Sequence, residues 1–115
     1  MGINVTLGFV DVIIPKDQIN EAYKETSQLN TGHYQGYCNL SEVLIELGYD
    51  ICFNDNGDLE VVDFLGNVFC DDDVLWSTLS SYIKSGGYVL LNVGCKYEKW
   101  EFIDGKIKKY LGRIV

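Results

Sequence analysis

The sequence predicts an α+β fold in a single domain, residues 1–115, in which a mainly antiparallel sheet of about six strands packs against three helices. Apolar side chains alternate with polar ones at period two in some segments and recur at helical spacing in others, and two glycine-containing turns separate alternating runs. The expected order is β-α-α-β-β-α-β-β-β, with the helices on one sheet face. A chain of 115 residues with 47% hydrophobic residues is long enough to bury one core.

The strands are predicted from alternation and from turn residues. Residues 3–14 alternate at first and then become apolar on both faces, which indicates a strand that is central at its end. Asn56-Gly57 stands between alternating runs at 49–54 and 59–64 and is the strongest short hairpin signature, because both residues of such a turn take positive φ. Further strands are expected at about 88–93, 97–103 and 106–111, the last two joined by Asp104-Gly105.

The helices are predicted from apolar stripes and end signals. Residues 16–26 carry a stripe formed by Ile19, Ala22, Tyr23 and Thr26. Asn39 and Glu42 have the spacing of a capping box and begin a short second helix. The third helix is expected at 74–84, with Lys84 in its last turn and an inward stripe of Leu75, Leu79, Tyr82 and Ile83.

A two-residue turn would also fix the register of the hairpin. It pairs Asp50 with Asp63, Asp55 with Asp58 and Phe53 with Glu60. The side chains expected on the core face are those of Tyr49, Ile51, Phe53, Val62 and Phe64. Glu60 falls on that same face, so it is expected near the exposed end of the hairpin.

Charge is segregated along the chain. From Glu25 to Ile83 there are eleven acidic residues and no Lys or Arg, whereas residues 84–115 hold seven bases against three acids. Folded surfaces usually intersperse both signs. A surface of one sign steers a partner of the opposite charge and speeds its encounter. The sequence therefore predicts a basic protein partner.

The acids most informative about binding are those of the hairpin. Like charges facing across two strands are destabilising, and Asp is a poor strand residue, so Asp50 opposite Asp63 breaks a local rule without local gain. Acids at a helix start have a structural explanation in the helix dipole. An alternative is a merely solvated hairpin face, neutralised by Lys96, Lys99 or Lys108. The expected partner-binding residues are Asp50, Asp55, Asp58, Glu60, Asp63, Asp71, Asp72 and Asp73, with Tyr49 or Trp76 as anchors if exposed.

Catalytic, metal and cofactor signals are weak. The one histidine, His33, falls in an expected loop, and there is no nucleophile elbow or phosphate-cradling glycine loop. Asn54–Asp58 resembles the start of a calcium loop, but Cys52 would occupy its first ligand position. No cofactor and no metal are expected. The chain has no CxxC pair among its cysteines, which are Cys38, Cys52, Cys70 and Cys95. Cys52 and Cys70 are expected as small core residues.

Nucleic-acid and membrane partners are also not expected. The basic C-terminal stretch is interrupted by Glu98, Glu101 and Asp104, and the net charge of −8 opposes phosphate binding. The longest apolar run is too short to span a bilayer, and the start of the chain lacks a charged leader followed by an apolar run. A cytoplasmic location is therefore expected.

Residues 59–110 resemble small acidic bacterial immunity proteins, including those of contact-dependent growth inhibition and other polymorphic toxin systems. The resemblance is carried by an acid-preceded helix with Leu75, Trp76 and Tyr82, by Ser85–Leu90 and by Lys99–Lys106. Where such chains often carry a Gly-Glu-Asp-Gly turn before the Trp strand, this one has Gly94-Cys95-Lys96-Tyr97.

The resemblance implies a cytoplasmic inhibitor without enzymatic activity that binds a toxin domain, often a nuclease, and blocks its active site or substrate channel. Charge leads to the same expectation, because a nuclease is basic in order to hold phosphates and an acidic surface can occupy the same groove. Two alternatives stay open. One is a DNA-mimic or antirestriction-type acidic protein, whose acids follow an extended surface, and the other is a small hydrolase with two carboxylates in a deep pocket.

Overall fold

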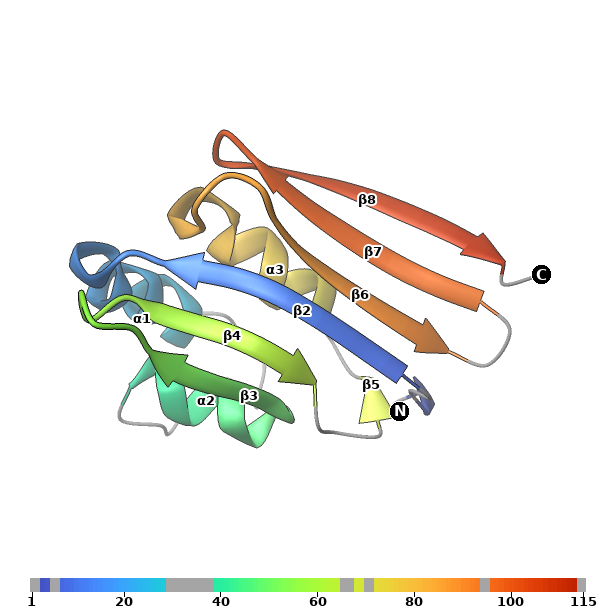
Figure 1. The fold of residues 1–115 in the computed structure, drawn as a ribbon, viewed down its shortest axis with the longest axis horizontal. Helices are drawn as coiled ribbons and strands as arrows, with labels where there is room; N and C mark the ends of the chain where they lie inside the picture. The colour runs from blue at the N-terminus through green and yellow to red at the C-terminus, as the bar shows by residue number, and fades with distance from the viewer. Residues whose placement is uncertain are drawn as a thin grey trace.

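The computed structural model describes residues 3–4, 7–28, 39–64, 68–69, 72–93 and 96–113. Six strands form one antiparallel sheet in the order β3-β4-β2-β6-β7-β8, and three helices lie on one of its faces (Figure 1), which confirms the predicted α+β fold. The strands are β2 (Leu7–Ile14), β3 (Tyr49–Phe53), β4 (Leu59–Phe64), β6 (Gly87–Val93), β7 (Lys96–Ile103) and β8 (Lys106–Arg113). The helices are α1 (Ile19–Ser27), α2 (Leu40–Glu46) and α3 (Asp72–Leu79).

The long N-terminal strand predicted at 3–14 is divided. Its first part, β1 (Ile3–Asn4), pairs with β5 (Val68–Phe69) in a separate two-stranded sheet. Its second part, β2, lies between β4 and β6 in the main sheet, as its two apolar faces predicted.

Two short 3-10 turns accompany the helices. One, η1 (Lys16–Gln18), follows Pro15 and leads into α1, and the other, η2 (Ser80–Tyr82), follows α3. The third helix therefore ends before Lys84, which was expected in its last turn. Ile83 is already extended, and the Lys84 N–H donates to the Ile13 carbonyl at 2.8 Å, so the chain leaves the helix to join β2.

The core lies between the sheet and the helices. Its largest side chains are those of Trp76, Trp100 and Phe102, all fully buried. The Trp76 ring meets the Tyr49 ring edge-on at 5.2 Å between centroids, and its Nε1–H donates to the Tyr49 hydroxyl at 3.1 Å. Tyr49 is 2% exposed and Trp76 is fully buried, so neither meets the condition of exposure on which its expected role as a partner anchor depended.

The hairpin of β3 and β4 keeps part of its predicted register. Asp50 pairs with Asp63, as expected, and Tyr49 pairs with Phe64, but a bulge after Asp50 then pairs Ile51 with Val61. Val62 is the extra residue of that bulge.

The turn explains the shift. The Asn54 N–H donates to the Asp58 carbonyl at 3.1 Å, and only Gly57 takes a positive φ, of 85°. The Asn54 side-chain oxygen accepts from the N–H groups of Asn56 and Asp58, at 2.9 and 3.0 Å. This side chain stabilises a loop one residue longer than the predicted Asn56-Gly57 turn.

The longer loop corrects several predicted positions. Phe53 pairs with Leu59 and Cys52 with Glu60, so the expected pairs of Phe53 with Glu60 and of Asp55 with Asp58 are wrong. Leu59 and Val61 are buried, whereas Val62 and Phe53, expected in the core, are exposed. Glu60 lies opposite Cys52 and away from the core.

Other local predictions are confirmed. The Asn39 side chain caps α2 by accepting from the Glu42 N–H at 2.9 Å. Asp104 and Gly105 both take positive φ, of 51° and 76°, and join β7 to β8 as a two-residue turn.

Replacing Tyr49 by Phe tests the polar contact within the core. The change leaves the buried Trp76 Nε1–H without this acceptor, and we expect it to lower the free energy of unfolding by about 1–3 kcal/mol. Urea denaturation measures the change. Tyr88→Phe removes a hydroxyl from a half-buried ring and should stay within about 0.5 kcal/mol of wild type; equal losses in the two variants would contradict the assignment.

Candidate functional site

The sheet order separates the two charge signs in space. The hairpin from Tyr49 to Phe64 carries five acids and no base, and it forms one side of the sheet. The last two strands, from Lys96 to Arg113, carry six bases and three acids and form the opposite side. Strands β2 and β6 lie between them. The charge segregation along the sequence therefore becomes a charge separation across the sheet.

We call the sheet surface opposite the helices the open face. Cross-strand partners share a face, so its rows follow from the register: Asp11 pairs with Tyr88, Tyr88 with Glu101 and Glu101 with Lys108. The next row runs through Phe9, Leu90, Lys99 and Tyr110. No described helix covers this face (Figure 1).

Asp50 and Asp63 are the opposed pair at the acidic side of the open face. Asp50 is exposed, and Asp63 is half-buried and accepts the Phe64 N–H at 2.8 Å. Within the ranges that the structure describes, neither carboxylate forms an ion pair with a Lys or Arg. Glu60 lies on the same face, with Cys52 and Ile13 as its cross-strand neighbours.

The basic strands do not neutralise these acids. Lys99 pairs with Glu101 at 3.8 Å and lies over the Tyr88 ring, and Lys108 lies over the Tyr110 ring. Hydrogen bonding to Tyr110 raises the pKa of Lys108. Because β2 and β6 separate these strands from the hairpin, the alternative in which Lys96, Lys99 or Lys108 compensates Asp50 and Asp63 is not supported.

The two acids of the turn differ in role. Asp58 accepts the Lys16 N–H at 2.8 Å and a hydrogen bond from the Asn54 amide at 3.2 Å. These hydrogen bonds lower the pKa of Asp58, and the bond from Lys16 has the larger effect of the two. Asp58 is therefore a structural residue that ties the turn to η1, whereas Asp55 is exposed at the tip.

Several predicted residues fall outside what the structure describes. Asp71 lies outside the described residues, as do the side chains of Asp72 and Asp73, whose backbone begins α3. Four further residues also lie outside the described residues, namely His33, Cys38, Cys70 and Cys95. Cys52 is described and is exposed, so its expected burial is wrong.

Sequence reasoning missed three residues of the open face. Asp11 lies on β2, outside the base-free stretch, and no ion pair of the described residues includes it. Phe9, on the same strand and face, is 48% exposed, and Val62 on β4 is 44% exposed. The period-two pattern of β2 placed Phe9 and Asp11 on one face, but only the sheet order shows that this face meets the hairpin acids.

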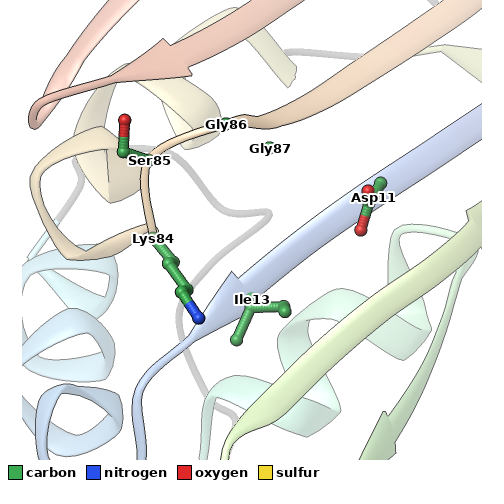
Figure 2. Close-up of a pocket in the computed structure, with 6 residues that line it drawn as sticks. All are labelled: Asp11, Ile13, Lys84, Ser85, Gly86 and Gly87. Carbon is green, nitrogen blue, oxygen red and sulfur yellow. The ribbon is translucent and has the colours of Figure 1, made fainter.

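A pocket of about 190 Å³ opens beside Asp11. It is lined by residues in the second half of β2, in the segment before β6 and at the first position of β6, namely Asp11, Ile13, Lys84, Ser85, Gly86 and Gly87 (Figure 2). A Cβ atom on Gly87 would lie 2.7 Å from the Asp11 carbonyl oxygen, so glycine permits this close approach. A pocket with one carboxylate does not provide the two acids expected of the hydrolase alternative.

A second, wider hollow lies on the helical side. It measures about 540 Å³ and is lined by Glu25, Gln28, Ser77, Thr78, Ser80 and Ser81. The Tyr82 hydroxyl donates to the Glu25 carboxylate, which raises the pKa of Tyr82 to about 12. Among the described residues, no three His, Cys, Asp or Glu side chains come together as metal ligands.

Comparison with family models, with curated proteins and with solved structures found no match to this chain. No helix in the described part of the chain is long and apolar enough to cross a membrane.

Replacing Asp58 by Asn tests the separation of structural from binding acids. Because hydrogen bonds hold the folded pKa of Asp58 below its ordinary value, its charge stabilises the fold above that ordinary pKa and loses this effect as the pH falls through the folded pKa. We expect D58N to have a lower urea midpoint than wild type at pH 7, with a gap that narrows as the pH falls through the lowered folded pKa of Asp58. D55N is the control and should match wild type throughout; a gap independent of pH would contradict the assignment.

Proposed function

We propose that this chain is an immunity protein that binds and neutralises a basic toxin domain in the cytoplasm. The toxin domain is expected to be a nuclease. The observation that carries the proposal is the opposed pair of Asp50 and Asp63 on the open face, without a compensating base among the described residues. The resemblance of residues 59–110 to immunity proteins supports the same function. No catalytic role is assigned to any residue.

The arrangement of the acids supports an inhibitor more than a DNA mimic. Asp50, Glu60 and Asp63 occupy one side of one sheet face, and Asp11 lies on the adjacent strand β2. A mimic would instead space its acids along an extended surface. The basic strands at the other side would also interrupt such a surface. A clustered patch is suited to a compact basic groove, in which arginine and lysine side chains converge.

Apolar residues among the acids would supply the affinity that charge alone does not. Phe9 and Val62 are large, exposed side chains on the open face, close to Asp11 and Asp63 in the sheet. Interface energy concentrates in desolvated apolar anchors, while surrounding charges govern encounter and orientation. These two residues take the anchoring role that the buried Tyr49 and Trp76 cannot fill.

Coexpression tests the function itself. The partner to be sought is the C-terminal domain of a large exported protein, and the genes beside the one for this chain are the place to look for it. We expect that domain to arrest growth when produced alone, to be tolerated when this chain is coexpressed, and to copurify with it. Arrest that this chain fails to relieve would contradict the proposal.

Charge reversal tests the surface. Asp50→Lys with Asp63→Lys should slow association with that domain about three- to tenfold at low salt, with a smaller effect at high salt, because the local field no longer steers a basic partner. Stopped-flow mixing or surface plasmon resonance measures the association rate. Asp17→Lys with Glu46→Lys changes the net charge equally at exposed acids away from the open face, and should slow association less. Equal slowing by the two double variants would show that total charge, not this patch, is responsible.

A further inference from the structure

We propose that the pocket beside Asp11 receives an arginine side chain of the partner. This inference rests on the proposed function, because it specifies what the basic partner presents at the same acidic face. Asp11 lies outside the base-free stretch of the sequence, and it stands at the centre of the open face instead of at its acidic side.

The neighbours of Asp11 fit a guanidinium group. Phe9 and Ile13 lie two positions away on the same strand and therefore on the same face, and Tyr88 is the cross-strand partner of Asp11. Arginine pairs with a carboxylate through two parallel hydrogen bonds and packs its flat surface on aromatic rings. The Tyr88 ring already holds one cation, because the Lys99 ammonium lies 5.6 Å from its centroid.

The position of Asp11 suits an anchor contact. Strand β2 is the third of six strands, so Asp11 lies near the middle of the open face, with Val62 on the neighbouring β4. Residues that dominate binding lie near the centre of an interface, in pockets that the surrounding contacts seal from water, and arginine is enriched among them. A volume of about 190 Å³ has room for one side chain and not for a nucleotide.

The pocket walls are held by the backbone. The Lys84 N–H bond to the Ile13 carbonyl fixes one wall, and the Gly86 N–H bond to the Phe102 carbonyl, at 2.8 Å, fixes the turn. The Ser85 hydroxyl accepts the Asp104 N–H at 3.2 Å. These bonds position the pocket before a ligand enters, which lowers the cost of ordering on binding.

Among the described residues that line the pocket, Lys84 is the one cation, and it opposes an incoming guanidinium. Its side chain extends toward the part of β2 that carries Ile13, while Asp11 stands farther along the strand (Figure 2). The two charged groups form no ion pair, and the field of Lys84 also reaches Asp58, whose pKa it helps to lower. In the described part of the chain, no ion pair involves the Asp11 carboxylate. Removing the charge of Lys84 should strengthen cation binding and weaken anion binding. A variant at this residue therefore distinguishes a cationic occupant of the pocket from an anionic one.

Nuclear magnetic resonance titration of the full ¹⁵N-labelled chain tests the pocket without the toxin. The cationic probe is N-acetyl-arginine amide, and the anionic probe is N-acetylglycine. We expect the cation to shift the amide signals of Asp11, Gly86 and Gly87 with a dissociation constant in the millimolar range, as isolated surface pairs are weak. Asp11→Asn should weaken this binding about threefold, Lys84→Gln should tighten it about twofold, and the control Asp17→Asn should leave it unchanged.

The opposite pattern overturns the inference. If N-acetylglycine shifts the same amides and Lys84→Gln weakens that binding, the pocket takes an anion. If neither probe shifts them, the pocket takes no charged side chain. The Lys84 variant keeps the test decisive should the Asp11 variant lose its native spectrum. Failure of this titration with successful growth rescue rejects only the arginine pocket, whereas a positive titration without rescue rejects only the immunity function.

Discussion

Strand β2 is the element on which the rest of the sheet depends, because it is hydrogen-bonded to β4 on one side and to β6 on the other. These two neighbours come from different parts of the chain, and β2 is what joins the β3–β4 hairpin to the three C-terminal strands. Its inward residues Val10, Val12 and Ile14 are buried under the helices. The same strand turns Phe9 and Asp11 outward, so one element supplies both the centre of the core and the centre of the open face.

The connection through β2 also explains how a charge pattern in sequence becomes one in space. Had β3 paired with β8, the hairpin acids would have met the C-terminal lysines, and the two signs would have cancelled locally. With β2 and β6 between them, the acids stay uncompensated among the described residues, and the lysines associate with Tyr88, Tyr110 and Glu101 instead. Net charge alone is compatible with either arrangement. Only the strand order decides which surface a basic partner meets.

The sequence predictions were accurate where patterns among neighbouring residues determine the structure, and less accurate where contacts between distant segments determine it. Elements set by local patterns were predicted well: the α1 stripe, the Asn39 cap, the Asp104-Gly105 turn and the last three strands. Errors arose where one specific hydrogen-bonding arrangement outweighs a general preference. Asn54 stabilises a longer turn than Asn56-Gly57 predicts, and the chain after α3 leaves the helix to bond with Ile13. The roles assigned here to Asp11 and Asp58 depend on contacts between segments more than forty residues apart, which local periodicity does not report.

The bulge at Val62 has a consequence for how the hairpin can vary. The longer turn and the bulge each shift the register by one residue, and together they restore the pairing of Asp50 with Asp63. On either side of Val62 the inward residues, Val61 and Phe64, and the outward Asp63 keep the order of a regular strand. Val62 is therefore an insertion that adds an apolar group to the surface while leaving the composition of the core intact. Related chains could gain, lose or exchange a residue at this one position and so retune their choice of partner without a new fold.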